Sequence, residues 1–181
     1  MKNSLFLLLL IGLASSVFAQ DANNVKVFAD KKASSISYSM HHPLHSWTGV
    51  SNDVTSLILT DADRSTVKQV AVNVKIASFD SQNANRDSHV IEASEGLKYP
   101  TVSFSSSSIQ TQGDLLLVKG TLAFHGVSQP VSFQATRKKV GSKLEISGEF
   151  TLKMTQFKIE PPSLMGMSTD DDFKLTFKML Y

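Results

Sequence analysis

Cysteine is absent from the 181 residues of this sequence. The chain therefore cannot form a disulfide, and it cannot carry the lipid-modified cysteine of a bacterial lipoprotein. After Gln20 it also lacks an apolar run long enough to cross a bilayer as a helix. We expect no transmembrane anchor, and a single domain of about 160 residues that depends on its own core for stability.

The sequence also lacks a marked excess of charge of either sign. The sequence has 18 Lys and Arg against 16 Asp and Glu, a formal net charge of +2. Its close basic clusters, Lys31-Lys32 and Arg137-Lys138-Lys139, are typical of solvated turns, although a weak attraction to anionic head groups stays open. We expect no nucleic-acid partner.

The amino terminus has the pattern of a secretory signal peptide. Lys2 supplies a positive charge, an apolar run follows it, and small residues stand at and before Ala19. We expect residues 1–19 to be cleaved and residues 20–181 to form one exported domain. The expected location is the periplasm or the extracellular medium.

Apolar and polar residues alternate with a period of two along most of the remaining chain. The alternating apolar sets are Ile36, Tyr38 and Met40; Val70, Val72, Val74 and Ile76; Val102 and Phe104; Leu116, Val118, Leu122 and Phe124; Val131, Phe133 and Ala135; Leu144, Ile146 and Phe150; and Phe173, Leu175, Phe177 and Met179. This period is typical of antiparallel strands with one apolar face. Turn residues near 61–63, 112–114, 125–126 and 140–142 predict hairpins between them.

One helix interrupts the strands. Asn83 or Asn85 can cap its start, Asp87 suits its first turn, and Gly96 is a plausible stop. The patterns predict an all-β protein, a barrel or sandwich of about eight antiparallel strands with one short helix inserted.

Two segments carry a more specific signal. Residues 78–102 lead from a strand through the helix to Tyr99-Pro100, and residues 120–133 are two strands joined by a tight connection at 125–129. Together they resemble the YceI-like family of bacterial periplasmic proteins, from about Ser34 to Tyr181. The resemblance implies a lipocalin-like barrel whose interior binds long-chain lipids, polyisoprenoids among them.

The interior can be interpreted in two ways. From the residues alone a packed core is favoured, because apolar strand faces usually form cores. The resemblance reverses this preference and implies a cavity that holds a long lipid tail. The lipid-binding residues expected on this basis are Tyr38, Met40, Val72, Val74, Phe104, Leu122, Phe124, Phe133, Ile146, Phe150 and Phe177.

Arg86 lies near the positive end of the helix, where its charge is unfavourable, so it needs a tertiary partner. A buried carboxylate is the more common partner for arginine. The alternative is a lipid head group, and Arg86 is our head-group candidate.

The run His41-His42-Pro43-Leu44-His45 looks like a metal site at first sight. It contains a proline and has no nearby cysteine or clear carboxylate, so we expect loop histidines, with no metal, no cofactor and no catalytic residue. We likewise expect His125 to be only a turn residue.

The main hypothesis is an exported protein that sequesters a long-chain apolar or isoprenoid lipid. The alternatives are a metal-dependent or hydrolytic enzyme using His41, His42 and His45, and a structural envelope protein with a filled barrel. Residues 164–167, Leu-Met-Gly-Met, form either a pliable lid or, as we favour, a plug packed onto the barrel end.

Overall fold

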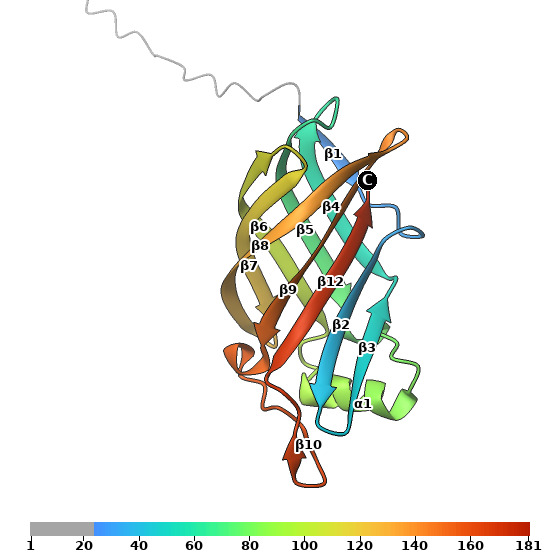
Figure 1. Ribbon diagram of the computed structural model, residues 1–181, viewed down its shortest axis with the longest axis vertical. Coiled ribbons are helices and arrows are strands. Elements are labelled where there is room, and N and C mark those ends of the chain that lie inside the picture. The colour runs from blue at the N-terminus through green and yellow to red at the C-terminus, as the bar shows by residue number, and fades with distance from the viewer. Residues whose placement is uncertain (1–23) are drawn as a thin grey trace, which may run out of the picture.

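Ten strands form one curled antiparallel sheet around a long interior in the computed structural model, which describes residues 24–181 (Figure 1). Along the sheet the strands follow the order β1-β4-β5-β6-β7-β8-β9-β12-β2-β3. Their bounds are β1 Asn24–Phe28, β2 Ser35–His42, β3 His45–Ser51, β4 Val54–Asp61, β5 Val67–Lys75, β6 Thr101–Gln112, β7 Leu115–Phe124, β8 Val127–Val140, β9 Lys143–Lys153 and β12 Asp172–Leu180. The predicted all-β, lipocalin-like fold is confirmed, with more strands than the eight expected.

The period-two pattern and the turns explain most of this sheet. The apolar sets named above face the interior, and the tight turns between β6 and β7, β7 and β8, and β8 and β9 contain Gly113, Gly126 and Gly141. These glycines have φ values of +61°, +72° and +61°. Glycine adopts such angles without steric cost, so the predicted hairpins form as expected.

Strands β1, β3 and β4 carry no clear alternation in the sequence. On β4 the buried positions alternate between apolar and polar residues, Val54, Ser56, Ile58 and Thr60, and apolar side chains also occupy the outer face. The sheet therefore has strands whose inward faces are too polar for a hydrophobicity pattern to reveal.

The sheet closes without a ladder between its edge strands β1 and β3. The Ala29 amide donates to the Ser56 carbonyl on β4 (2.8 Å), and the Asp30 amide donates to the Leu180 carbonyl on β12 (2.7 Å). At the opposite end, Val50 of β3 and Asp80 exchange two backbone hydrogen bonds of 2.9 Å. Single segments therefore bridge the gap that a further strand pair would otherwise fill.

Helix α1 (Ala84–Ala93) lies across one end of the barrel, after the 3-10 turn η1 (Ile76–Ser78) (Figure 1). As predicted, Asn83 caps it: its side-chain oxygen accepts from the Arg86 amide at 3.1 Å. The predicted stop at Gly96 comes too late: the helix ends at Ala93 with Ser94 as its C-cap, and Glu95 then takes the left-handed conformation (φ 45°). Across residues 24–181, no helix is both long and apolar enough to cross a bilayer. The predicted signal peptide, residues 1–19, lies outside the described residues.

Residues 163–168 do not form the expected plug. Strands β10 (Ser163–Leu164) and β11 (Met167–Ser168) make a small hairpin after the 3-10 turn η2 (Met154–Phe157), and the hairpin projects from the α1 end of the barrel (Figure 1). Its tip, Met165, is 83 % exposed. Met165 and Gly166 both have positive φ, so the chain reverses in a tight turn at this tip. The base of the hairpin contacts the barrel through the Met167 carbonyl and His42 Nε2 at 3.1 Å.

Candidate functional site

The interior of the barrel contains a cavity of about 480 Å³. This volume lies within the range of about 300–1,000 Å³ that is usual for small-molecule sites. Aliphatic and aromatic side chains of β2, β5, β6, β7, β8, β9 and β12 make up most of its wall. The barrel is therefore not filled by its own side chains.

All eleven residues predicted to bind lipid lie in the wall of this cavity. They are Tyr38, Met40, Val72, Val74, Phe104, Leu122, Phe124, Phe133, Ile146, Phe150 and Phe177, and Arg86 lies in the wall as well. Their part in binding remains a prediction. Their common placement follows from the pleat, because alternate residues of each strand face the same side of the sheet.

Four phenylalanines form the centre of the wall. The rings of Phe133 and Phe150 stack at 4.5 Å between centroids, and Phe104 and Phe177 lie 5.4 and 5.7 Å from Phe133. Gly120 provides room for one of them, since a Cβ there would lie 2.5 Å from the Phe104 ring. The aromatic cluster therefore has a fixed shape set by the backbone on which it rests.

The cavity is closed at the end away from α1. Val67, Leu116, Met179 and Tyr181 line it there and are almost completely buried. The Tyr181 hydroxyl bonds to Ser56 Oγ at 2.5 Å, and burial raises the pKa of Tyr181 to about 12. Among these four residues only Tyr181 has a polar side-chain group, and this hydroxyl is paired. The end is therefore sealed by buried side chains.

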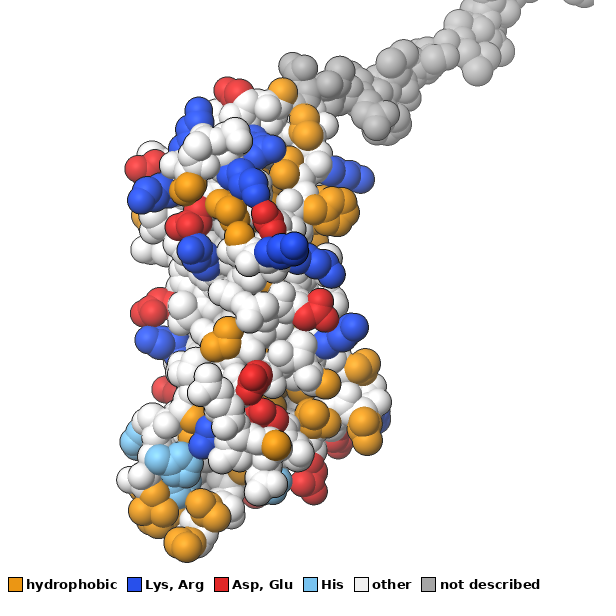
Figure 2. All heavy atoms as spheres, turned by 90° about the vertical axis from the view of Figure 1, so that its right-hand side faces the viewer, with side chains coloured by type: hydrophobic (Ala, Val, Ile, Leu, Met, Phe, Trp, Pro, Cys, Tyr) orange, Lys and Arg blue, Asp and Glu red, His pale blue; other side chains and the backbone are white. Residues whose placement is uncertain are grey.

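The opposite end forms a mouth. The exposed residues that line the cavity here are Asn83, which caps α1, Asn85 and His89 of α1, His45 of β3 and Leu164 of β10. Figure 2 shows hydrophobic and histidine side chains gathered at this end of the molecule, whereas Lys and Arg concentrate toward the closed end. A ligand can therefore enter between α1, the β2–β3 hairpin and the β10–β11 hairpin.

Three buried polar atoms of the cavity wall have no hydrogen-bond partner among residues 24–181: Tyr38 Oη, Trp47 Nε1 and Thr169 Oγ1. Burial raises the pKa of the Tyr38 hydroxyl, and the adjacent Trp47 indole partly opposes this rise. Such atoms are uncommon in folded proteins and mark places where a partner is missing.

Arg86 does not have the carboxylate partner that is usual for arginine. Its Nη1 donates to Ser81 carbonyl and hydroxyl oxygens at 3.3 and 3.4 Å, and its guanidinium lies 5.3 Å from the centre of the Trp47 ring. Within the described part of the chain no ion pair involves Arg86. The nearby Asp87 accepts instead from the Ser81 amide.

The histidine run differs from the exposed loop we expected. His42 is only 1 % exposed: its Nδ1 accepts from the Leu44 amide (3.2 Å), and its Nε2 donates to the Met167 carbonyl (3.1 Å). His41 Nδ1 lies 3.1 Å from Asp170 Oδ2. The run was misread because it forms the ends of two paired strands, β2 and β3, rather than a loop. Residues 24–181 contain no group of three or more His, Cys, Asp or Glu side chains placed to hold a metal.

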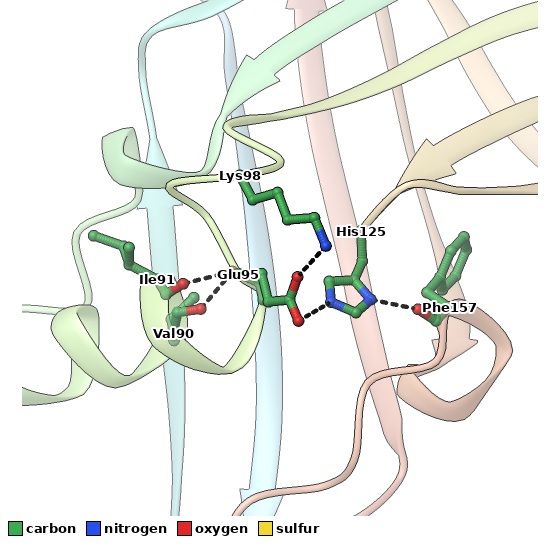
Figure 3. A network of polar contacts seen from close by, with 7 residues as sticks. Val90, Ile91, Glu95, Lys98, His125 and Phe157 are labelled. Carbon is green, nitrogen blue, oxygen red and sulfur yellow. Dashed lines mark hydrogen bonds and ion pairs between the residues drawn. The ribbon is translucent and has the colours of Figure 1, made fainter.

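His125 does more than form a turn (Figure 3). Its Nδ1 donates to the Phe157 carbonyl at 2.8 Å, and its Nε2 lies 3.8 Å from Glu95, which also contacts Lys98 at 3.2 Å. The ring thereby links the β7–β8 turn to η2 and to the end of α1. Both ring nitrogens are used for structure.

Sequence reasoning missed several residues of the wall, of which Trp47 is the most informative. It is the only tryptophan of the chain, and it lies on β3, whose inward positions include Gly49 and Ser51. The pattern there is too polar to predict a strand. The register of β2 with β3, which pairs Met40 with Trp47, could have been inferred only from a hairpin at Pro43-Leu44.

Comparison with known sequences gives a consistent result. A protein named UPF0312 from Pseudomonas putida is 29 % identical over 164 residues, covering 86 % of this chain and 82 % of its own. Protein YceI from Escherichia coli O157:H7 is 29 % identical over 138 residues, covering 75 % and 72 %.

Solved structures share the fold. The crystal structure of BcnA from Burkholderia cenocepacia superposes with a TM-score of 0.76 at 18 % identity, covering 84 % of this chain and 99 % of its own. A polyisoprenoid binding domain from Saccharophagus degradans superposes with a TM-score of 0.69 at 13 % identity, covering 85 % and 97 %. The YceI-like domain matches residues 29–180, and with this coverage the chain belongs to the YceI-like family.

Proposed function

We propose that this protein is an exported carrier that holds one long-chain apolar or isoprenoid lipid in its barrel. The observation that carries the proposal is the cavity of about 480 Å³, open at the α1 end and walled by aliphatic and aromatic side chains. Polyisoprenoid binding in the domain from Saccharophagus degradans, which has the same fold, supports the same class of ligand.

The chemistry of the wall suits a lipid tail. Burial of each methylene contributes about 0.8 kcal/mol and needs no polar partner. The stacked Phe133 and Phe150 offer a flat apolar surface in the cavity wall. Affinity then comes from the tail, and a shorter chain loses affinity in steps of one methylene.

The carrier performs no catalytic step. This part of the proposal is supported by the use of both His125 nitrogens and both His42 nitrogens in structural contacts. A nucleophile and a base would need a free nitrogen within reach of a hydroxyl or thiol. The residues lining the cavity are suited to hold a ligand rather than to change it.

Extraction with organic solvent and mass spectrometry of purified protein tests the proposal directly. We expect about one hydrophobic molecule per chain, and uptake of a fluorescent fatty or prenyl probe after delipidation. Repeated extraction that finds no lipid, together with no uptake, would favour a structural envelope protein that carries no ligand.

A matched pair of variants on β7 locates the site. Phe124 lines the cavity and contacts Phe157 and Phe173, whereas Thr121 lies on the exposed face of the same strand. Phe124→Glu should abolish probe uptake, because a charge in an apolar wall is costly. Thr121→Glu should bind as wild type. If Phe124→Glu fails to fold, Val72→Phe, which narrows the cavity without a charge, should still lower uptake.

Export is the second part of the proposal, supported by the pattern of residues 1–19. Fractionation of cells that express the full chain should recover it outside the cytoplasm, with Gln20 as its first residue. A chain lacking residues 2–19 should stay in the cytoplasm. Equal distribution of the two forms would contradict export.

A further inference from the structure

We propose that the cavity recognises the polar end of its lipid as a hydrogen-bond acceptor oxygen, bound by donors from Tyr38, Trp47 and Arg86. The inference rests on the proposed function and adds the chemical class of the ligand's polar end. It predicts that oxygen-headed lipids are preferred over hydrocarbons and amines of the same length.

The first two donors are the unpartnered atoms of β2 and β3. Tyr38 is 7 % exposed, and the indole N–H of Trp47 lies beside its oxygen without the geometry of a hydrogen bond, so neither donor is satisfied among the described residues. The ring of Tyr38 lies across Gly49, where a Cβ would come within 2.4 Å of it. The sequence thus provides a glycine to seat a buried tyrosine whose hydroxyl then has no protein partner. Leaving a buried donor unpaired is unfavourable, and a ligand oxygen would relieve it.

The third donor adjoins the second. The Arg86 guanidinium lies over the Trp47 ring, and Ser81 oxygens contact only its Nη1. An indole N–H and a guanidinium can donate but cannot accept. The ligand group that binds Trp47 Nε1 and Arg86 must therefore offer lone pairs. An ammonium head has none, and a hydrocarbon makes no hydrogen bond with either donor.

The charge at this place is mixed. Asp87 opposes Arg86 in its effect on the Tyr38 hydroxyl, although its carboxylate already accepts from the Ser81 amide. The ligand's acceptor oxygen can therefore belong either to a neutral carbonyl or to an anionic carboxylate. The ligand oxygen then lies near α1, and the lipid tail extends toward the closed end. The Tyr181 hydroxyl at that end is already paired with Ser56.

The test uses four probes of one chain length, a fatty acid, a methyl ketone, a primary amine and an alkane, in competition with a bound fluorescent lipid. We expect the acid and the ketone to bind about tenfold more tightly than the alkane, and the amine to gain nothing. Tyr38→Phe and Trp47→Phe should each weaken the oxygen-headed probes about three- to tenfold, the usual effect of one lost hydrogen bond, and leave the alkane unchanged. Arg86→Gln distinguishes the heads: a selective loss for the acid indicates an anionic ligand, and an equal loss for acid and ketone indicates a neutral one.

Tyr181→Phe is the matched control. It should lower the melting temperature, because Ser56 Oγ loses its bond to the Tyr181 hydroxyl and keeps only the Ala71 carbonyl, but it should not alter the order of the probes. Tyr38→Phe should lower the melting temperature less than Tyr181→Phe, since its hydroxyl has only the poorly aligned Trp47 indole beside it. Equal affinity for alkane and ketone, or an equal loss for both in Tyr38→Phe and Trp47→Phe, would overturn the inference while leaving the carrier intact. Failure of every probe to bind would overturn both.

Discussion

Two buried tyrosines mark the two ends of the cavity, and their surroundings differ. Tyr181 at the closed end bonds through its hydroxyl to Ser56, and its backbone exchanges two 2.8 Å hydrogen bonds with Leu144. Tyr38, nearer the mouth, has a hydroxyl with no described partner. The same residue type is thus part of a finished core in one place and of an incomplete polar group in the other.

The difference extends to the segments around them. At the closed end Arg64 Nη1 donates to the carbonyls of Tyr181 and Ser142 at 3.0 and 3.1 Å. At the mouth the turn residue Leu44 is 56 % exposed and Met165 is 83 % exposed. We therefore expect stability to be concentrated where the cavity is sealed, whereas the mouth keeps apolar and polar groups that a ligand can use. The comparison predicts different responses at the two ends.

The largest contrast is expected for truncation of one leucine at each end. Leu116 is 1 % exposed and Leu164 is 49 % exposed, and both line the cavity. Leu116→Ala should lower the free energy of unfolding by about 2–5 kcal/mol, and Leu164→Ala by less than about 0.5 kcal/mol. Urea denaturation of the lipid-free protein measures both. Similar losses would mean that the mouth is as well packed as the closed end.

Alkaline pH should act mainly through the closed end. The pKa of Tyr181 is raised from its ordinary value of 10 to about 12, so the unfolded chain loses this proton first. The stabilisation is complete below about pH 10 and is lost as the pH rises toward 12, a loss on the order of 2–3 kcal/mol. Tyr38 adds to it in the same direction.

Unfolding free energies measured between pH 9 and pH 11.5 test this contribution. Tyr181→Phe should be less stable than wild type at pH 9 and should show a shallower decline. A decline as steep as that of the wild type would assign the effect to other groups.

The sheet and most of the cavity wall could be predicted from the sequence, because both depend on local regularities. Alternation places Val72, Phe104 and Phe133 on one face, and that face becomes the wall. The helix cap at Asn83 is equally local. The family resemblance supplied the open interior, which hydrophobicity alone does not distinguish from a packed core.

The polar part of the site could not be predicted, because it depends on contacts distant in sequence or on register. His42 is buried through Met167, and Arg86 is seated on Trp47, 39 positions away in the numbering. Trp47 itself faces inward only because β3 pairs with β2. The expectation of exposed histidines failed at His42, and that of a carboxylate partner for Arg86 failed, for this reason.

Removal of the hydrogen bond from His125 should destabilise the mouth, with a smaller loss of unfolding free energy than the changes at the closed end. His125→Asn tolerates the left-handed backbone (φ 51°) but is too short to keep the bond to the Phe157 carbonyl. We expect a loss of about 1 kcal/mol, with faster amide exchange in α1 and η2 and no change near Tyr181. Glu92→Gln, at an exposed position of α1 outside the cavity wall, is the control and should change neither. Faster exchange at the closed end would show that the two ends do not open separately.

The smallest effect is expected from metals, and it bears on the enzyme alternative at the mouth. His42 uses both ring nitrogens, and His41 Nδ1 is held by Asp170, so His41, His42 and His45 cannot converge on one ion without breaking these contacts. A ligand that binds only the folded state raises the melting temperature by mass action. We therefore expect equal melting temperatures in zinc, in chelator and in neither, and elemental analysis of untagged protein should find no stoichiometric zinc, copper or nickel. About one metal per chain, lost together with stability in His41→Asn and His45→Asn but not in His89→Asn, would make the mouth a metal centre and favour an enzyme over a carrier.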